Sequence, residues 1–230
     1  MITFIVTSYN RPEGLGTFLK SLEAQTDQDF ETIIVDDNSS NPNVEPIILE
    51  FFKQGRRGIY IKTGVQDEER KKLVRYAVNI NLVLTAETKL ITGNLICYQQ
   101  DDTELAPDFV KTVHRHFMEN PEHLAGYVCE TWEKDGEITT TLWNGEPVVV
   151  AFCALDMSQV VHRAEHAQLW GAIHPLAWGI ADGIFLERLL GRVGTIYPIG
   201  NSKSLVTNHI QDSSCSRQPI EQALKVLEAK

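Results

Sequence analysis

Two adjacent carboxylates, Asp101 and Asp102, are the residues of this chain that most directly suggest chemistry. They follow the apolar, β-prone run at residues 95–98, and Pro107 is typical of the start of a helix. Two acids at the end of a buried strand are costly unless a cation neutralises them. A divalent metal that holds a diphosphate would do so, since hard cations bind carboxylate oxygens. The alternative is an acidic loop whose carboxylates lie in water.

Three other polar segments are predicted to share one edge of a sheet with these acids. They are residues 8–11, residues 36–39 and the segment before Arg70. In an open parallel sheet, ligands bind outside the carboxyl ends of the strands, where the strand order reverses. The sequence therefore predicts a ligand site built from four loops.

The side chains of these loops are complementary to a nucleoside diphosphate. Tyr9 can stack on a base, and Asp37 can accept a hydrogen bond from a base N–H. Arg11 and Arg70 can pair with phosphates, and Asp102 can hold a metal. Together they predict a site for a nucleoside diphosphate that carries a group to be transferred.

The elements that must position these loops alternate along the first half of the chain. Apolar runs predict strands, and stripes at helical spacing predict helices between them. The strands are predicted at residues 2–7, 32–35, 58–62 and 95–99, and the helices around residues 15–22, 47–52, 67–86 and 109–117. This alternation predicts an α/β fold with a mostly parallel sheet and helices on both faces.

After Asn120 the pattern changes to consecutive strand-like runs with polar turns, which favour antiparallel pairing. These runs cover residues 127–132, 138–143 and 148–155. A helix at 182–190, a last strand at 193–199, a polar segment at 210–219 and a closing helix at 220–229 are predicted to follow. Because neither an internal repeat nor a linker is present, we expect one domain over residues 1–230.

Composition argues against several classes of protein. The net charge of −10 argues against a nucleic-acid-binding surface, because phosphate contacts need clustered Lys and Arg. The four cysteines show no paired spacing, which argues against a disulfide framework or a zinc site. The N-terminal residues lack a charged region, and no apolar run is long enough for a membrane span. These features predict a cytoplasmic protein.

Two nucleotide-binding motifs are absent. There is no G-x-x-x-x-G-K-[ST] loop, which argues against a P-loop nucleotidase, and no G-x-G-x-x-G after the first strand, which argues against a dinucleotide-binding dehydrogenase. A nucleotidyltransferase would need a basic, Gly-rich first loop, whereas residues 8–14 contain one Arg and one Gly.

At residues 5–40 the sequence resembles the opening of family 2 glycosyltransferases. Within that family the match is closer to the nucleotide-diphospho-sugar transferases of spore coat polysaccharide synthesis. The shared motifs are TSYN at 7–10, QTDQDFE at 25–31, VDDNS at 35–39, ER at 69–70, RYA at 75–77, INLVL at 80–84, QDD at 100–102, VVHR at 160–163 and IADGIF at 180–185. The resemblance covers most of the chain and weakens after residue 108.

The resemblance implies roles for the first four loops. Thr7, Tyr9 and Asp37 would hold the nucleotide base and ribose. Arg11 and Arg70 would lie near the base or the diphosphate. The plainer alternatives are that Tyr9 packs against the first helix and that Arg70 pairs with a neighbouring acid.

The resemblance also implies which residues bind the metal and which residue acts as the general base. Asp101 and Asp102 match the last two residues of the family's D-x-D-like motif, with Asp102 as the direct ligand of Mg²⁺ or Mn²⁺. Asp182 matches the general base, and His209 lies where some members place a further metal or diphosphate contact. A helix N-cap is the alternative for Asp182, and a structural histidine is the alternative for His209.

The implied protein is an inverting, metal-dependent glycosyltransferase with the Rossmann-like GT-A fold. Residues 1–108 would bind the nucleotide sugar, and residues 109–230 would form a smaller antiparallel, acceptor-side half. A UDP- or dTDP-sugar would donate to a hydroxyl of a saccharide, lipid, protein or small molecule in polysaccharide or glycoconjugate synthesis. Gln100 replaces the first Asp of D-x-D, which leaves a non-catalytic nucleotide-sugar-binding protein as the alternative.

Overall fold

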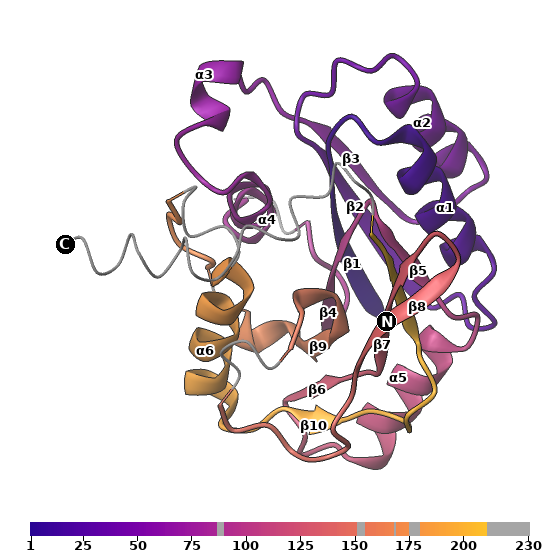
Figure 1. The fold of residues 1–230 in the computed structure, drawn as a ribbon, viewed down its shortest axis with the longest axis vertical. Helices are drawn as coiled ribbons and strands as arrows, with labels where there is room; N and C mark the ends of the chain where they lie inside the picture. Colours follow the sequence, from indigo (N-terminus) through magenta and orange to yellow (C-terminus); the bar gives the residue numbers. More distant parts are fainter. Residues whose placement is uncertain (87–89, 151–154, 168, 175–179, 211–230) are drawn as a thin grey trace.

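A seven-stranded sheet crosses the molecule in the computed structural model, which describes residues 1–86, 90–150, 155–167, 169–174 and 180–210 (Figure 1). Its strands are β1 (Ile2–Ser8), β2 (Phe30–Asp36), β3 (Gly58–Lys62), β4 (Leu95–Gln100), β6 (Ala125–Tyr127), β9 (Val160–Arg163) and β10 (Tyr197–Pro198). A second, four-stranded sheet contains β5 (Thr103–Leu105), β7 (Glu130–Lys134), β8 (Glu137–Leu142) and β11 (Val206–His209).

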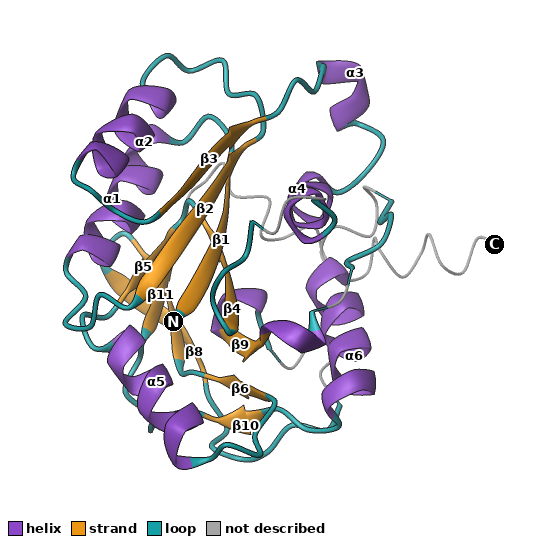
Figure 2. Ribbon diagram, turned by 180° about the vertical axis from the view of Figure 1, so that it is seen from behind, coloured by secondary structure: helices purple, strands orange, loops and turns teal. Residues whose placement is uncertain are grey.

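Helices cover both faces of the large sheet, as the alternating pattern predicted (Figure 2). The helices are α1 (Pro12–Glu23), α2 (Val44–Lys53), α3 (Asp67–Arg70), α4 (Arg75–Leu84), α5 (Phe109–Glu119) and α6 (Ala181–Val193), with 3₁₀ turns η1 (Met157–Gln159) and η2 (Ala164–His166). One buried cluster joins α1, α2 and α5 to the sheet, and a second joins α4 and α6 to the opposite face. Every residue of β1 and β2 is buried, because both faces of these strands are covered.

The strand order places the predicted loops at one edge of the sheet. The order is β10-β6-β9-β4-β1-β2-β3. Strands β2 and β3 lie on one side of β1 and β4 lies on the other, so the strand order reverses between β1 and β4. These strands are parallel to β2 and β3, and Thr7 aligns with both Val35 and Gln100. The loops that follow β1, β2 and β4 therefore begin side by side at the switch point where a ligand is expected.

The first half of the fold confirms the prediction with two corrections. Strand β5, which the prediction missed, joins the smaller sheet. Residues 67–86, predicted as one helix, form two helices, α3 and α4. Val74 has an extended backbone, and its N–H donates to the carbonyl of Ile173 at 2.8 Å, so a contact distant in sequence interrupts the helix.

The second half differs more from its prediction. Residues 127–132, predicted as one strand, are divided between β6 in the large sheet and β7 in the small one. The strand β9, which the prediction missed, runs antiparallel between β4 and β6. Residues 193–199 form only the short β10, because α6 continues to Val193 and ends at Gly194, whose φ is 76°.

The smaller sheet is mixed, which refines the predicted antiparallel half. Strand β11 is parallel to β7 and antiparallel to β5, and β7 and β8 form an antiparallel hairpin. Within the predicted run 148–155, Val148 forms an isolated bridge with Ile196, and residues 151–154 lie outside the described part. The predicted C-terminal helix also lies outside it. No helix in the described part is long and apolar enough to cross a membrane.

Candidate active site

The two acids after β4 are bound to the loop after β1. The backbone N–H of Tyr9 donates to Oδ2 of Asp101 at 2.9 Å. Nη1 of Arg11 lies 2.8 Å from Oδ2 of Asp102 and 3.4 Å from Oδ1 of Asp101. Both carboxyl groups are buried, so the acids are not a solvated loop. The sequence prediction that these residues meet at the sheet edge is confirmed.

One oxygen of this pair has no partner within the described part of the chain. Oδ1 of Asp102 is buried and accepts no hydrogen bond from any described residue. Burial raises the pKa of Asp102, against the charge and hydrogen bond of Arg11. Burial and the charge of Asp102 raise the pKa of Asp101 to about 6. An unsatisfied buried carboxylate oxygen is an exception that a cation would explain.

The surroundings of Asp102 fit Mg²⁺ or Mn²⁺ held jointly with a substrate. Among the described residues, no group of three or more His, Cys, Asp or Glu side chains is arranged to hold a metal ion. Mg²⁺ is commonly bound by one or two carboxylates together with substrate phosphates. Asp102 therefore fits a site that a diphosphate completes, and not a closed protein site.

The loop after β2 carries a second carboxylate, which is bound by two arginines. Oδ2 of Asp37 lies 2.5 Å from Nη1 of Arg70, and Nη2 of Arg75 donates to Oδ1 at 2.8 Å. Although burial alone raises the pKa of Asp37, the hydrogen bonds and charge of Arg75 and the charge of Arg70 hold it below its usual value. Asp37 is therefore an ionised, fixed acceptor.

Arg70 also connects Asp37 to the exposed Tyr9. The guanidinium carbon of Arg70 lies 3.9 Å from the centroid of the Tyr9 ring, a cation–π contact, and Tyr9 is 41% exposed. These two contacts direct the guanidinium of Arg70 toward the site, which a purely surface arginine would not do. An aromatic ring and a guanidinium stand together beside Asp37.

Two asparagines shape the loops after β1 and β2. Asn10 and Asn38 have φ values of 56° and 60°, a left-handed conformation that Asn tolerates better than most residues. Oδ1 of Asn10 accepts the N–H groups of Ser40 and Asn41 at 2.9 Å each. These hydrogen bonds tie the two loops together and so fix Tyr9 relative to Asp37.

The predicted base, Asp182, lies in the first turn of α6. The hydroxyl of Tyr76 in α4 donates to its Oδ1 at 2.7 Å. Burial and the charge of Asp156 raise the pKa of Asp182 to about 7, against the hydrogen bonds from Tyr76 and from the backbone of Met157. A carboxylate with this pKa is suited to take a proton near neutral pH.

An aromatic cluster positions Asp182 and Tyr76. The rings of Trp170 and Phe185 stack at 4.1 Å, and Tyr76 meets Trp170 edge-on at 5.5 Å. Phe185 is on the same helix as Asp182, so this packing fixes α6 relative to α4. Trp170 is fully buried and is a core residue.

The positions of Thr7 and His209 say less about their predicted roles. Thr7 is buried in β1, between Val35 and Gln100 on the neighbouring strands. The backbone N–H of His209 donates to the carbonyl of Asp102 at 2.8 Å. Its ring, however, pairs with Glu104 at 3.0 Å, so a metal role for His209 stays a prediction that requires this pair to open.

Sequence reasoning missed three residues of this site: Arg75, Tyr76 and Asp156. The sequence marks the first two only as part of the RYA motif, because their partners are 38 and 106 positions away. Asp156 has a local signal, since Asp-x-x-Gln at 156–159 forms a capping box around η1.

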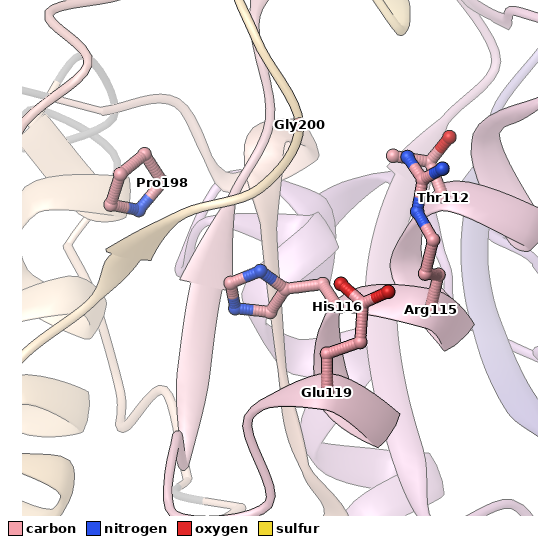
Figure 3. A pocket seen from close by; sticks show the side chains of 6 residues that line it. All are labelled: Thr112, Arg115, His116, Glu119, Pro198 and Gly200. Carbon is pink, nitrogen blue, oxygen red and sulfur yellow. The ribbon is translucent and has the colours of Figure 1, made fainter.

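A cavity of about 330 Å³ lies elsewhere, between α5 and the segment around β10 (Figure 3). It is lined by Thr112, Arg115, His116, Glu119, Pro198 and Gly200. Helix α5 begins beside the C-terminal end of α1, where the backbone N–H of Val110 donates to Oε1 of Gln25 at 3.1 Å, whereas α1 has its N-terminal end next to Arg11 of the site. This cavity contains none of the predicted site residues.

The sequence matches a known family over its first two thirds. A family model described as Glycosyl transferase family 2 matches residues 3–147. The chain belongs to this family. The match contains every predicted donor-binding residue and Asp102, but not Asp182 or His209. The Bacillus subtilis (strain 168) protein CgeD is 30% identical over 203 residues, which cover 82% of this chain and 46% of CgeD.

Solved structures share the fold at low sequence identity. TarS 1–349 of S. aureus, solved in complex with UDP-GlcNAc, has a TM-score of 0.61 and 15% identity over 99% of this chain and 65% of TarS 1–349. The mannosyltransferase PcManGT from Pyrobaculum calidifontis, solved with GDP-Man and Mn²⁺, has a TM-score of 0.64 and 13% identity over 100% of this chain and 64% of PcManGT. These likenesses confirm the GT-A fold. The chain spans less than two thirds of the length of each of these relatives.

Proposed function

We propose that this chain is the catalytic unit of an inverting, metal-dependent glycosyltransferase that uses a nucleotide-diphosphate sugar. The observation that carries the proposal is Oδ1 of Asp102 at the β1/β4 switch point, which is buried and has no hydrogen-bond partner among the residues that the structure describes. The chain also carries Asp182, a carboxylate whose pKa is raised to about 7. A cation-binding oxygen and a proton acceptor are the two groups that this transfer needs.

The donor would be held by the loops after β1, β2 and β4. Tyr9 offers an exposed ring for the base, and Asp37 offers a fixed, ionised acceptor for a base or ribose donor. Arg11 and Arg70 lie beside these groups and would bind the ribose side or the diphosphate. This assignment gives residues 1–108 the nucleotide-sugar-binding role and residues 109–230 the acceptor role.

In the transfer step, Asp182 takes the proton of the acceptor hydroxyl. The hydroxyl oxygen forms a bond to the anomeric carbon while the bond from that carbon to the diphosphate oxygen breaks. Because attack and departure occur on opposite faces, the anomeric configuration inverts. A divalent cation bound at Asp102 would neutralise the charge that develops on the leaving diphosphate. Arg11, already within hydrogen-bond distance of Asp102, adds a fixed positive charge there.

The donor is expected to be a UDP- or dTDP-sugar. GDP-mannose is a further donor to assay, because PcManGT was solved with it. The acceptor hydroxyl would belong to a growing polysaccharide or another glycoconjugate. The test is release of nucleoside diphosphate from these donors with Mn²⁺ or Mg²⁺ and a panel of saccharide acceptors. Asp102→Ala and Asp182→Asn should each lose at least about a hundredfold in rate. The matched control is Asp135→Asn in the β7–β8 turn, where the φ of 53° suits Asn.

Full activity of Asp102→Ala would overturn the metal assignment, and full activity of Asp182→Asn would overturn the base. Gln100 supports a second candidate, a nucleotide-sugar-binding protein without transfer. Its amide Nε2 lies 3.6 Å from Sδ of Met157, where the D-x-D motif has a carboxylate. That candidate predicts calorimetric binding of a nucleotide sugar with no turnover on any acceptor.

A further inference from the structure

Asp156 is a carboxylate that the proposed mechanism has not used. It is half-buried at the start of η1, where its Oδ1 accepts the N–H of Ser158 at 2.9 Å and the hydroxyl of Ser158 at 2.8 Å. The backbone N–H of Gln159 also donates to this carboxylate, in the capping box around η1. The protein therefore fixes the carboxylate of Asp156 and leaves it acceptor capacity for a ligand, because an ionised carboxylate has about four acceptor sites.

A count of protons shows how Asp156 is held. The hydroxyl oxygen of Ser158 lies 2.8 Å from Oδ1 of Asp156 and 3.0 Å from Oε2 of Glu130, yet a hydroxyl has one proton. Two short contacts with carboxylate oxygens therefore require a second proton on one of the acids. Glu130 is fully buried, and its burial and the charge of Asp156 raise its pKa well above the usual value.

Glu130 is accordingly the acid that carries the proton. Its Oε1 accepts the indole N–H of Trp132 at 2.9 Å, and its protonated Oε2 donates to Ser158. Ser158 then donates to Asp156. Burial raises the pKa of Asp156 too, against the N–H and the hydroxyl of Ser158, which stabilise its ionised form. The chain Glu130–Ser158–Asp156 fixes the position of a negative carboxylate without neutralising it.

This carboxylate lies near both reactive ends of the site. The residue that follows it, Met157, donates its backbone N–H to Asp182 and places its sulfur 3.6 Å from the amide nitrogen of Gln100. The charge of Asp156 is near enough to raise the pKa of both Asp182 and Asp102. In the proposed function, the transferred sugar must lie between a diphosphate at Asp102 and an acceptor oxygen at Asp182.

We propose that Asp156 binds a hydroxyl group of the sugar that is transferred, and that it is a specificity-determining residue of the donor site. A carboxylate makes a strong, charge-assisted hydrogen bond with a sugar hydroxyl. The inference rests on the proposed function, because it takes the position of the sugar from the roles of Asp102 and Asp182. It predicts that Asp156 recognises the sugar part of the donor and not the nucleotide part.

The experiment compares binding of nucleotides with and without the sugar. Wild type, Asp156→Asn and the control Asp135→Asn are titrated calorimetrically with UDP, UDP-GlcNAc, GDP and GDP-mannose in the presence of Mn²⁺. Asn also caps helices well, so Asp156→Asn should keep η1, and a thermal melt checks this. The affinity of Asp156→Asn for the nucleotide sugar should fall about tenfold, with nucleoside diphosphate affinity within about twofold of wild type.

The outcomes separate this inference from the proposed function. If wild type binds no nucleotide sugar, the proposed function fails and this inference fails with it. If wild type binds one and Asp156→Asn binds it equally well, or loses the nucleoside diphosphate by the same factor, only this inference is overturned.

Glu130→Gln tests the proton chain independently of Asp156. The Gln amide accepts from Trp132 and donates to Ser158 as a protonated carboxyl does, so its affinity for the nucleotide sugar should stay within about twofold of wild type. Glu130→Leu removes both contacts, and its affinity for the nucleotide sugar should fall while its nucleoside diphosphate affinity persists. Equal losses in the Gln and Leu variants would refute the assignment of the proton to Glu130.

Discussion

Tyr76→Phe should move the acid limb of the transfer reaction to higher pH. The hydroxyl of Tyr76 donates to Oδ1 of Asp182 at 2.7 Å and stabilises the ionised form. Without this donor, the pKa of Asp182 rises above its value of about 7. A general base acts in its ionised form, so the pH below which activity is lost rises with it. Phe keeps the edge-on ring contact with Trp170.

The expected size follows from the hydrogen bond. A hydrogen bond to a charged group contributes about 1.5–3 kcal/mol, and one pKa unit corresponds to about 1.4 kcal/mol. Because the backbone N–H of Met157 still donates to Asp182, we expect a shift at the lower end, about one unit. A pKa of about 8 in place of about 7 reduces the ionised fraction at pH 7 about fivefold. At pH 9 the variant should have nearly the wild-type rate.

The assay is the pH profile of kcat/KM for nucleoside diphosphate release, measured from about pH 6 to pH 9. Tyr60→Phe is the matched control, because Tyr60 donates to a different carboxylate, Asp36, at 3.3 Å. Its acid limb should coincide with that of wild type. The reasoning is refuted if the Tyr76→Phe profile keeps the wild-type acid limb, or if its rate falls by one constant factor at every pH.

Three further predictions test the site and its scaffold. Asp102→Asn should abolish the rise in Tm that Mn²⁺ produces in the presence of UDP, and an unchanged rise would contradict the metal site. Arg75→Met should cost about 2 kcal/mol in urea unfolding at pH 7, because it removes one of the cations that pair with the buried Asp37. The pKa of Asp37 is lowered in the folded state, so its stabilising contribution is present above the pKa of the unfolded state and is lost as pH falls through the pKa of the folded state. The cost of Arg75→Met should therefore shrink at acid pH. Gly93→Ala should destabilise by about 1–3 kcal/mol in the same assay, because a Cβ there would lie 2.8 Å from the backbone nitrogen of Thr3.

The first half of the fold was predictable because its strands carry their own signal. A parallel strand that is covered on both faces needs a continuous apolar run, and residues 2–7 and 32–35 are such runs inside β1 and β2. For β3, residues 58–62 were predicted with the observed bounds. The polar residues that stop each run mark the loops, so the amino-acid sequence alone is enough to place Tyr9 and Asp102 at one edge of the sheet.

The second half was less predictable because its pairings are long-range. A single apolar run at 127–132 supplies β6 to one sheet and β7 to the other, and periodicity does not record which sheet a residue joins. The four residues of β9 have a weak signal of their own, and their place between β4 and β6 depends on strands far away in sequence. The contacts of Asp37 with Arg75 and of Asp182 with Tyr76 are also long-range in sequence, so periodicity does not reveal them.

The structure also distinguishes the roles of two aspartates that residue type alone does not distinguish. Asp37 and Asp182 are both aspartates at element ends, but two arginines hold the pKa of Asp37 low, whereas burial and Asp156 raise that of Asp182 to about 7. An aspartate that stays ionised can only accept hydrogen bonds, so Asp37 is suited to hold a ligand. An aspartate that titrates near neutral pH can take a proton and release it, so Asp182 is suited to move one. The arginines near Asp37 and the carboxylate near Asp182 are therefore as much a part of the assignment as the two aspartates themselves.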